Sequence, residues 1–483
     1  MFESMEKSPL YPFLNPKSIA FYGASNSFSA MGTTQFRNIY ELGFQGNLYP
    51  IHPKLDQVQG WKAYNSVLDL PEAPDLAVMV LPTRIVPEVM EECGRKGIKN
   101  VIIVSGGFKE VGGEGAGLQE QIVAIANQYR MRFLGPNCIG VVNPYHKLNT
   151  TFFPYDTAPG FIGMASQSGS FVTQMFDYLA KFGLGFSSAI SVGNEANIDM
   201  VDCLEYLAAC PHTKVIALYI EAIRRGREFL DMARSITPHK PIVALYVGGS
   251  EAGKRAGFSH TGAMAGPDRL YDGVFRQSGV IRARSIEELF DFCWVLGACP
   301  IPKGNRVAIQ THSGGPGAAA ADACGRVGLD LPSLSSATRK KLAPFVPHTA
   351  SIKNPVDLTF TKNPLDYFHT IPKVLLEGEE TDGLLVYFLV PTQTVRRALE
   401  SMGMAEDQGL EQSEKIIEQQ SDAVSALPGE CGKPVLGYSL RTRDDFFIAR
   451  LQDKGIPVLG SPERGARAMG ALVRYARWRK ESC

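Results

Sequence analysis

The chain has 483 residues, which corresponds to about three domains at roughly 150 residues each. Lys and Arg together number 49, as do Asp and Glu, so the net charge is zero and favours neither a nucleic-acid nor an anionic-membrane partner. The nine cysteines form no C-x-x-C pair, and no apolar run is long enough to cross a bilayer. The N-terminus lacks the apolar core of a signal peptide, so we expect a soluble protein in the reducing cytoplasm.

The first third of the chain alternates short apolar strands with amphipathic helices. Strands are expected at 18–25, 47–54, 75–82 and 100–108, with helices after the first, third and fourth of them. Continuous apolar strands of this kind indicate a parallel sheet that is covered by helices on both faces. Residues 1–150 are therefore predicted to form a Rossmann-like α/β domain.

Ligands of such sheets bind at the carboxyl ends of the strands. The candidate binding residues at those ends are Gly23, Ala24, Ser25, Lys54, Pro82, Ser105, Gly106, Gly107 and Asn137. The first turn reads GASNSF rather than G-x-G-x-x-G, and the second strand is followed by Lys54 rather than by an acid. A cation suits a phosphorylated ligand better than a ribose diol, so an NAD(P)-dependent oxidoreductase is disfavoured.

The remaining two thirds contain two copies of one pattern of strands, turns and helices. The corresponding segments are 161–183 and 305–328, 191–199 and 351–358, 214–223 and 382–391, 240–247 and 433–440, and 279–296 and 455–475. Repeats of this length are domains rather than solenoid units. Two flavodoxin-like parallel-sheet domains are therefore predicted, at 151–302 and 303–483.

Each copy opens with a strand that leads through a Ser/Gly turn into a helix. The small and polar turn residues are Gln167, Ser168 and Gly169 in copy one, and Gly314 and Gly315 in copy two. The first N–H groups of a helix have no internal partner, and the helix dipole is positive there, so each turn is a candidate anion cradle. A tight structural turn with a serine cap is the alternative for either one. The duplication favours two helix ends that face one anion.

The copies differ at two places that bear on catalysis. Copy one inserts a Gly-, Ala- and Ser-rich segment, 248–268, with His260 near its centre. Copy one also has Glu221 at the end of an apolar strand where copy two has Leu389. A lone histidine is more often structural, but a small-residue loop would let an imidazole move, and imidazole is a nucleophile near neutral pH. A carboxylate such as Glu221 would orient that ring, so His260 and Glu221 are the predicted catalytic pair.

The segment SHTGAMAG at 259–266 closely resembles the phosphohistidine loop of ADP-forming acetyl-CoA synthetases, which are relatives of succinyl-CoA synthetase. Other motifs follow the order of that family along nearly the whole chain: YGAS, SGGFKE, GPNCIGVVN, SQSG, VGNEANID, YIEAI and SIKNPVDL. The resemblance implies the alpha subunit of a nucleoside-diphosphate-forming acyl-CoA synthetase. Such an acid–thiol ligase reversibly converts acyl-CoA, phosphate and ADP into the acid, CoA and ATP.

The resemblance also implies roles for individual residues. His260 matches the phosphate carrier, and Glu221 matches the glutamate that supports it. The two Ser/Gly turns match the helix ends that bind the phosphoryl group, and the strand-end residues of the first domain match the CoA site. The residues that match the acyl and phosphate pocket are Gly193, Asn194, Asn354, Pro355 and Asp357. One departure is His312, where relatives commonly have Asn.

Nothing in the sequence matches an ATP-grasp module or a P-loop. The resemblance therefore implies a separate ATP-grasp beta subunit that holds ADP or ATP with Mg²⁺, in a hetero-oligomer with two copies of each chain, and no metal site is expected on this one. A non-catalytic CoA-binding or regulatory homologue, or a subunit of another acyl-transferring complex, is the alternative function. Acetate, branched and aryl acids all remain open as the acyl group, as do ADP and GDP as the nucleotide.

Overall fold

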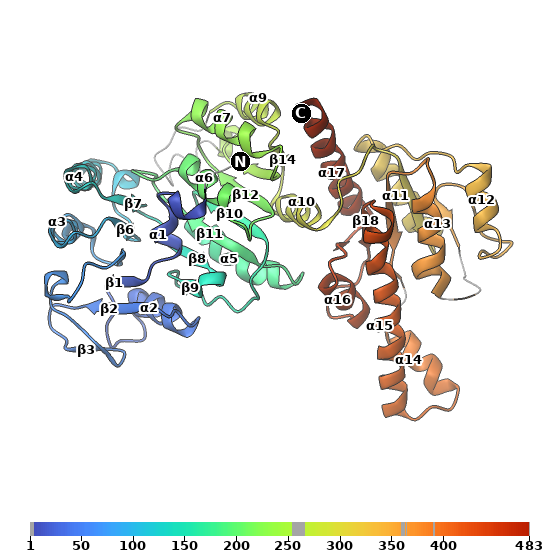
Figure 1. Cartoon of the computed structure of the whole chain (residues 1–483), viewed down its shortest axis with the longest axis horizontal. Coiled ribbons are helices and arrows are strands. Elements are labelled where there is room, and N and C mark those ends of the chain that lie inside the picture. The colour runs from blue at the N-terminus through green and yellow to red at the C-terminus, as the bar shows by residue number, and fades with distance from the viewer. Residues whose placement is uncertain (1–3, 254–265, 359–362, 364, 390–391, 483) are drawn as a thin grey trace. The chain divides into compact units, whose positions relative to one another are not determined.

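The computed structural model describes residues 4–253, 266–358, 363, 365–389 and 392–482 (Figure 1). The chain divides into two compact units. Unit 1 comprises Met1–Ala180 and Leu184–Arg284, and unit 2 comprises Lys181–Gly183 and Ser285–Cys483. Three largely parallel sheets are present, two in unit 1 and one in unit 2. The predicted α/β fold class is confirmed.

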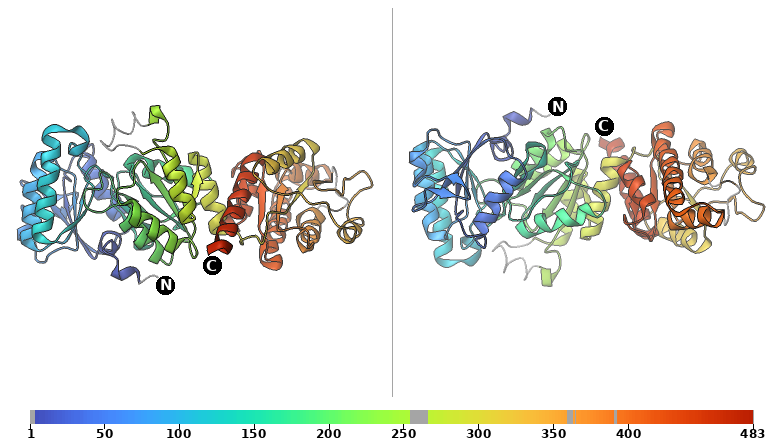
Figure 2. Two further views of the ribbon diagram at one scale, coloured as in Figure 1. Left: turned by 90° about the horizontal axis from the view of Figure 1, so that it is seen from above. Right: turned by 90° about the horizontal axis from the view of Figure 1, so that it is seen from below.

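The first sheet of unit 1 is parallel throughout, with the strand order β2-β1-β5-β6-β7. Its strands are β1 (Ser18–Tyr22), β2 (Asn47–Ile51), β5 (Leu76–Met79), β6 (Asn100–Ile103) and β7 (Arg132–Leu134). Its helices are α2 (Met31–Glu41), α3 (Val86–Lys96) and α4 (Gly113–Tyr129), and a small hairpin, β3 (Gln57–Val58) and β4 (Trp61–Lys62), follows β2. All residues of β1 and β5 are buried because helices lie on both sides of the sheet (Figure 2).

The second sheet of unit 1 has the order β14-β13-β12-β10-β11-β8-β9 and is parallel from β14 to β11. Its strands are β8 (Val141–Asn143), β9 (Leu148–Asn149), β10 (Ile162–Ser166), β11 (Phe186–Ser191), β12 (Val215–Ile220), β13 (Ile242–Tyr246) and β14 (Ile281–Ala283). Its helices are α5 (Gly169–Ala180), α6 (Met200–Ala209), α7 (Gly226–Ile236) and α9 (Asp268–Ser278). Strands β8 and β9 at one end of the sheet pair antiparallel and come from the segment that leaves the first sheet.

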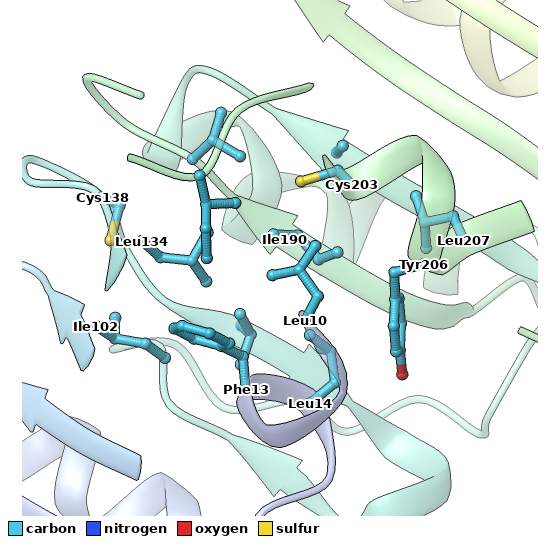
Figure 3. Close-up of a cluster of buried hydrophobic side chains, with 14 of the residues drawn as sticks. Leu10, Phe13, Leu14, Ile102, Leu134, Cys138, Ile190, Cys203, Tyr206 and Leu207 are labelled. Carbon is cyan, nitrogen blue, oxygen red and sulfur yellow. The ribbon is translucent and has the colours of Figure 1, made fainter. Parts of the chain in front are cut away.

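One hydrophobic core joins the two sheets of unit 1. The short helix α1 (Tyr11–Leu14) contributes Phe13 and Leu14, which are fully buried. Figure 3 shows them beside Ile102 of the first sheet and Ile190 of the second. Because apolar side chains of both sheets share this core, residues at the ends of their strands keep a fixed relation within unit 1.

The sheet of unit 2 is parallel, with the order β16-β15-β17-β18-β19. Its strands are β15 (Val307–Thr311), β16 (Val356–Asp357), β17 (Gly383–Tyr387), β18 (Val435–Tyr438) and β19 (Val458–Leu459). Its helices are α10 (Ile286–Ala298), α11 (Gly314–Arg326), α12 (Ser336–Leu342), α13 (Ile371–Glu377), α14 (Thr392–Ser401), α15 (Glu406–Cys431), α16 (Phe446–Asp453) and α17 (Pro462–Ser482). Helix α10 packs on α17, where Arg464 makes two hydrogen bonds to the buried Asp291.

The repeat that was predicted from the sequence is visible in the order of the strands. Strands β14-β13-β12-β10-β11 of the second sheet correspond one by one to β19-β18-β17-β15-β16 of the third. Both runs have the order 5-4-3-1-2 in their own chain numbering, which is the flavodoxin-like arrangement. The domain boundaries at 150 and 302 stay predictions.

Candidate functional site

The carboxyl ends of β1 and β2 enclose a cavity of about 360 Å³ in the first domain. It is lined by Tyr22, Gly23, Ala24, Ser25, Ile51, His52, Pro53, Asn65, Leu81, Ile85, Glu88, Val89 and Glu92. Gly23 has a φ of +95°, and a Cβ there would lie 2.0 Å from the carbonyl oxygen of Val80. Only glycine lets the first turn pass this close to the neighbouring strand. The cavity thus includes three of the strand-end residues predicted to bind a ligand.

A second part of the predicted site lies at the end of β6. The Ser105 hydroxyl donates to the carbonyl oxygen of Leu81 at 2.6 Å and accepts from its N–H at 3.1 Å, which fixes the segment before Pro82. Asn137 donates its main-chain N–H to the carbonyl oxygen of Ser105 at 2.9 Å, and a Cβ at Gly106 would lie 3.2 Å from its side-chain oxygen. The structure therefore brings Asn137 to the Ser105–Gly107 turn.

Lys54 is the exception among these residues. It is exposed and lies three residues beyond β2, and its N–H donates to Nδ1 of His52 at 3.2 Å. Its neighbour Pro53 lines the cavity. The ammonium group is thus available at the rim, where a phosphorylated ligand would meet it.

The Ser/Gly turn of copy one joins β10 to α5. The Ser166 hydroxyl donates to the carbonyl oxygen of Ser168 at 2.7 Å and accepts from its N–H at 3.1 Å, and α5 then begins at Gly169. Gln167 points toward the end of β12, where its Oε1 accepts from the N–H groups of Glu221, at 2.5 Å, and Ala222, at 3.0 Å. These hydrogen bonds connect the turn to the main chain at the predicted catalytic glutamate.

A small cavity lies where these strand ends meet, and its lining includes Glu221, which is only 8% exposed. The lining residues are Gln167, Gly193, Asn194, Glu195, Glu221, Ala222 and Arg224. Four of them were predicted from the sequence as catalytic or phosphate-pocket residues. Together with Glu195 and Arg224, they bring carboxylate, amide and guanidinium groups to one strand end.

Two residues of this cavity, Glu195 and Arg224, were missed by the sequence reasoning. Glu195 accepts from Nε2 of Gln167 at 2.7 Å and from the N–H of Met200 at 3.0 Å. Burial raises its pKa to about 7, although Gln167 and Arg224 act in the opposite direction. The signal available in the sequence was an acid beside Asn194 in a turn between buried elements, which is costly without partners.

His260 lies outside the described residues, so nothing in the structure bears on its position. The described chain resumes at Gly266, whose carbonyl oxygen accepts from the hydroxyl of Tyr246 at 2.8 Å. The roles of His260 and of the loop around it stay predictions.

The Ser/Gly turn of copy two repeats the bonds of the first. The Thr311 hydroxyl donates to the carbonyl oxygen of Ser313 at 2.8 Å and accepts from its N–H at 2.9 Å, and α11 begins at Gly314. His312 stacks on Tyr367 with ring centroids 3.6 Å apart, and burial lowers its pKa to about 4. A neutral imidazole therefore stands beside this turn at neutral pH.

The third predicted loop, 354–357, contacts two different parts of its domain. Asn354 donates to the carbonyl oxygen of Val307 at 2.8 Å and accepts from the N–H of Ile309 at 3.0 Å, so its side chain supports the first half of β15. Asp357 instead approaches the turn, because a Cβ at Gly314 would lie 3.3 Å from its Oδ2. Pro355 links the two residues. The two turns belong to different units, and a shared anion stays a prediction.

Two further features, a metal-binding cluster and a membrane-spanning helix, are absent from the described ranges of the chain. Among those residues, no group of three or more His, Cys, Asp or Glu side chains is placed to hold a metal ion. No helix among them is both long and apolar enough to pass through a membrane.

Family models match two parts of the chain. Residues 17–144 match a CoA binding domain, and residues 159–296 match a succinyl-CoA ligase like flavodoxin domain. The first range contains the whole first sheet, and the second contains strands β10 to β14 of the second sheet.

Individual relatives match over almost the whole chain. The alpha subunit of acetate–CoA ligase (ADP-forming) II from Pyrococcus furiosus is 40% identical over 96% of this chain and 97% of its own length. The ADP-forming 4-hydroxybutyrate–CoA ligase of Nitrosopumilus maritimus is 35% identical over 98% of this chain and 65% of its own length. The solved structure of Candidatus Korarchaeum cryptofilum acetyl-coenzyme A synthetase 1 with phosphate and ADP has a TM-score of 0.85 at 34% identity, covering 98% of this chain and 97% of that one.

Proposed function

This chain belongs to the family of ADP-forming acetyl-CoA synthetase alpha subunits, and we propose that it carries the acyl-transferring and phosphohistidine steps of such an enzyme. The overall reaction is acyl-CoA + phosphate + ADP = carboxylic acid + CoA + ATP, and it is reversible. It proceeds through an acyl phosphate and a phosphohistidine at His260. The observation that carries the proposal is the buried Glu221, which is clamped by Gln167 from the first Ser/Gly turn.

CoA binds across the carboxyl ends of the first sheet in this proposal. The cavity beside Gly23 and Ser25 accepts one part of the molecule, and the Ser105–Gly107 turn contacts another. Lys54 at the rim supplies a positive charge for a phosphate group. These residues hold CoA in place while its thioester reacts at the second domain.

Inorganic phosphate attacks the carbonyl carbon of the thioester, the carbon–sulfur bond breaks, and the CoA thiolate leaves. The product is an acyl phosphate, whose phosphoryl group lies at the helix N-terminus that begins at Gly169. N–H groups at such ends are already oriented, so they stabilise the negative charge without reorganising. The acyl group of the substrate is a carboxylic acid whose identity a panel of acyl-CoA thioesters would establish through the release of free thiol.

An imidazole nitrogen of His260 then attacks phosphorus, the phosphorus–oxygen bond to the acyl group breaks, and the carboxylate leaves. Glu221 accepts the N–H of the other imidazole nitrogen, which keeps the attacking nitrogen unprotonated and stabilises the positive charge that forms. The phosphoryl group next passes from His260 to ADP. A covalent carrier thereby divides one transfer into two positioned steps.

A separate ATP-grasp beta subunit holds ADP and Mg²⁺ in this proposal, and two copies of each chain form the complex. The Pyrococcus relative, which matches over nearly its whole length, is named as an alpha subunit, and this name supports a beta partner. The Nitrosopumilus relative has a further third of its length beyond the match. That third would correspond to the partner joined in one polypeptide.

The proposal is tested by labelling the chain with radioactive phosphate from ATP in the presence of the beta subunit. Wild-type chain should acquire an acid-labile, base-stable label, and His260→Asn should acquire none while it still binds CoA in calorimetry. His239→Asn is the matched control because His239 is an exposed histidine of the same domain. Wild-type labelling of the His260→Asn chain would refute the assignment.

A further inference from the structure

A partly buried polar cluster lies beneath the Ser105–Gly107 turn, where four segments of unit 1 meet. Its members are Glu110 of the short helix η4 (Lys109–Val111), Gln119 of α4, Asn137 after β7 and Asn194 after β11. Asn194 is 4% exposed and Gln119 is 8% exposed. Polar groups that are buried to this extent must find their partners inside the cluster.

Asn194 is the centre of the cluster. Its Nδ2 donates to Oε2 of Glu110 at 2.5 Å and to Oε1 of Gln119 at 3.1 Å, and its Oδ1 accepts from Nδ2 of Asn137 at 3.3 Å. Its main-chain N–H donates to the carbonyl oxygen of Pro136 at 2.9 Å. The loop that carries Asn194 is therefore held by residues of the first domain.

Glu110 holds the turn with its other carboxylate oxygen. Oε1 accepts from the N–H of Gly107 at 2.6 Å and from the N–H of Phe108 at 3.2 Å. A Cβ at Gly106 would lie 3.4 Å from the same oxygen. One carboxylate thus bridges the turn and Asn194. Such bonds matter to both partners, because hydrogen bonds to a carboxylate are about twice as strong as those between neutral groups.

The contacts continue from Asn194 into the cavity beside Glu221. The carbonyl oxygen of Asn194 accepts from Arg224 at 2.6 Å, and the carbonyl oxygen of Glu195 accepts from the same guanidinium group at 2.9 Å. Arg224 and Asn194 both line that cavity with Glu221. A continuous series of direct contacts therefore runs from Gly107 through Glu110 and Asn194 to the cavity.

We propose that Glu110 is a positioning residue that couples CoA binding at the Ser105–Gly107 turn to phosphate binding beside Asn194. The inference rests on the proposed function, which assigns those two ligands to these two places. A CoA group that binds the N–H groups of Gly107 and Phe108 changes the bonds of one Glu110 oxygen, and the other oxygen transmits the change to Asn194. Coupling between two binding sites is reciprocal, so phosphate alters CoA affinity by the factor by which CoA alters phosphate affinity.

Glu110→Gln breaks the bridge with almost no change in volume. If its amide oxygen accepts from Gly107 and Phe108, its NH₂ group faces the NH₂ group of Asn194, and the two groups can pair only after the amides of Asn194, Gln119 and Asn137 all reverse. Combining Glu110→Gln with Asn194→Asp restores a donor opposite an acceptor, because a carboxylate at position 194 accepts from the glutamine. Gln119 can turn its own amide to donate to that carboxylate. Glu114→Gln is the matched control, because Glu114 lies in the first turn of α4, is exposed and pairs with the exposed Arg84.

The test is a calorimetric titration of CoA into each chain, with and without saturating inorganic phosphate. In wild type and in Glu114→Gln, phosphate should change the dissociation constant of CoA by about fivefold or more, the lower end of ordinary coupling. In Glu110→Gln the dissociation constants of CoA with and without phosphate should differ by less than about twofold. In the double variant the logarithm of their ratio should return at least halfway to the wild-type value. Thermal unfolding midpoints show that each chain is folded.

Two results would overturn the inference: a wild-type CoA affinity that does not depend on phosphate, or a Glu110→Gln chain whose ratio equals that of wild type. Failure of the double variant to recover any coupling would also count against the bridge. These outcomes differ from failure of the proposed function. If CoA binds and His260 is phosphorylated while Glu110→Gln leaves the ratio unchanged, only the coupling role is lost.

Discussion

The second and third sheets share a five-strand order and a Ser/Gly turn, but they differ in the residue that follows the third strand of that order in the chain: a buried acid in copy one and an exposed leucine in copy two. Ser166 and Ser168 in copy one make the same pair of hydrogen bonds as Thr311 and Ser313 in copy two. At the end of β12 stands the buried Glu221, whereas the end of β17 is followed by a leucine that is 42% exposed. In the proposed function, the backbone of this fold supplies an anion cradle twice, and a few side chains decide which cradle performs chemistry.

The region beyond β17 shows how far the copies have diverged. The cavity there has a volume of about 760 Å³, and α14, α15 and α16 contribute to its walls. Its lining includes Leu389, Leu410 and Leu440 together with Arg396 and Arg441. It therefore offers space and apolar surface where copy one offers a compact polar network.

The largest effect that separates the copies is expected at the strand ends. Glu221→Gln should slow phosphoprotein formation about a hundredfold, because an amide orients the imidazole without stabilising its charge. Leu389→Gln, at the matching position, should change the rate by less than about twofold, as surface substitutions usually do. Rapid-quench measurement with ATP and the beta subunit gives both rates. If the two variants formed phosphoprotein at equal rates, Glu221 would have no catalytic role that distinguishes copy one from copy two.

The pH dependence of stability should reveal the buried acid of copy one. Glu195 has a folded pKa of about 7 against an ordinary value of 4.5, so the folded state binds the proton more tightly than the unfolded state. The contribution of Glu195 to the free energy of unfolding is fully present below pH 4.5 and is lost as the pH rises through 7. From pH 5 to pH 8, wild type should lose roughly 2 kcal/mol of unfolding free energy relative to Glu195→Gln. A difference that stays constant with pH in denaturant titrations would contradict this.

The two turns should differ in their tolerance of a methyl group. A Cβ at Gly169 would lie 3.1 Å from the Cβ of Ile139, whereas nothing lies within 4 Å of a Cβ at Gly315. Gly169→Ala should therefore cost about 1–2 kcal/mol of unfolding free energy through overpacking. Gly315→Ala should be neutral or stabilise by up to about 1 kcal/mol, because alanine is the better helix former. Urea unfolding monitored by circular dichroism measures both free energies. If Gly315→Ala were the more destabilising of the two, a methyl group at Gly169 would not be overpacked.

The smallest effect is expected at His312 and has the opposite pH sense. Its folded pKa of about 4 lies below the ordinary 6.5, so the folded state binds the proton less tightly. The contribution of His312 to the free energy of unfolding is fully present above pH 6.5 and is lost as the pH falls toward 4. Between pH 7 and pH 5.5, wild type should lose about 1 kcal/mol relative to His312→Asn, which cannot titrate. A difference that grew with rising pH would show that this ring is not buried in its neutral form.

The sequence predicted the sheets and the repeat because apolar strands, Gly turns and helical periodicity are local signals. It also predicted that Gln167, Asn194 and Glu221 belong to one site, and these residues do meet at one cavity. It did not reveal Glu110 or Arg224 as structural partners of that site. Their roles depend on hydrogen bonds between segments far apart in the chain, such as the bond from Asn194 to Glu110, and spacing along a sequence does not encode such contacts.

The most direct test of the central claim is to locate the phosphoryl group after wild-type chain reacts with ATP and the beta subunit. Peptide mapping by mass spectrometry at alkaline pH, which preserves phosphohistidine, reports on all eight histidines of the chain. The account predicts phosphate on His260 of copy one alone. Phosphate on His312 of copy two, or on no histidine, would contradict it.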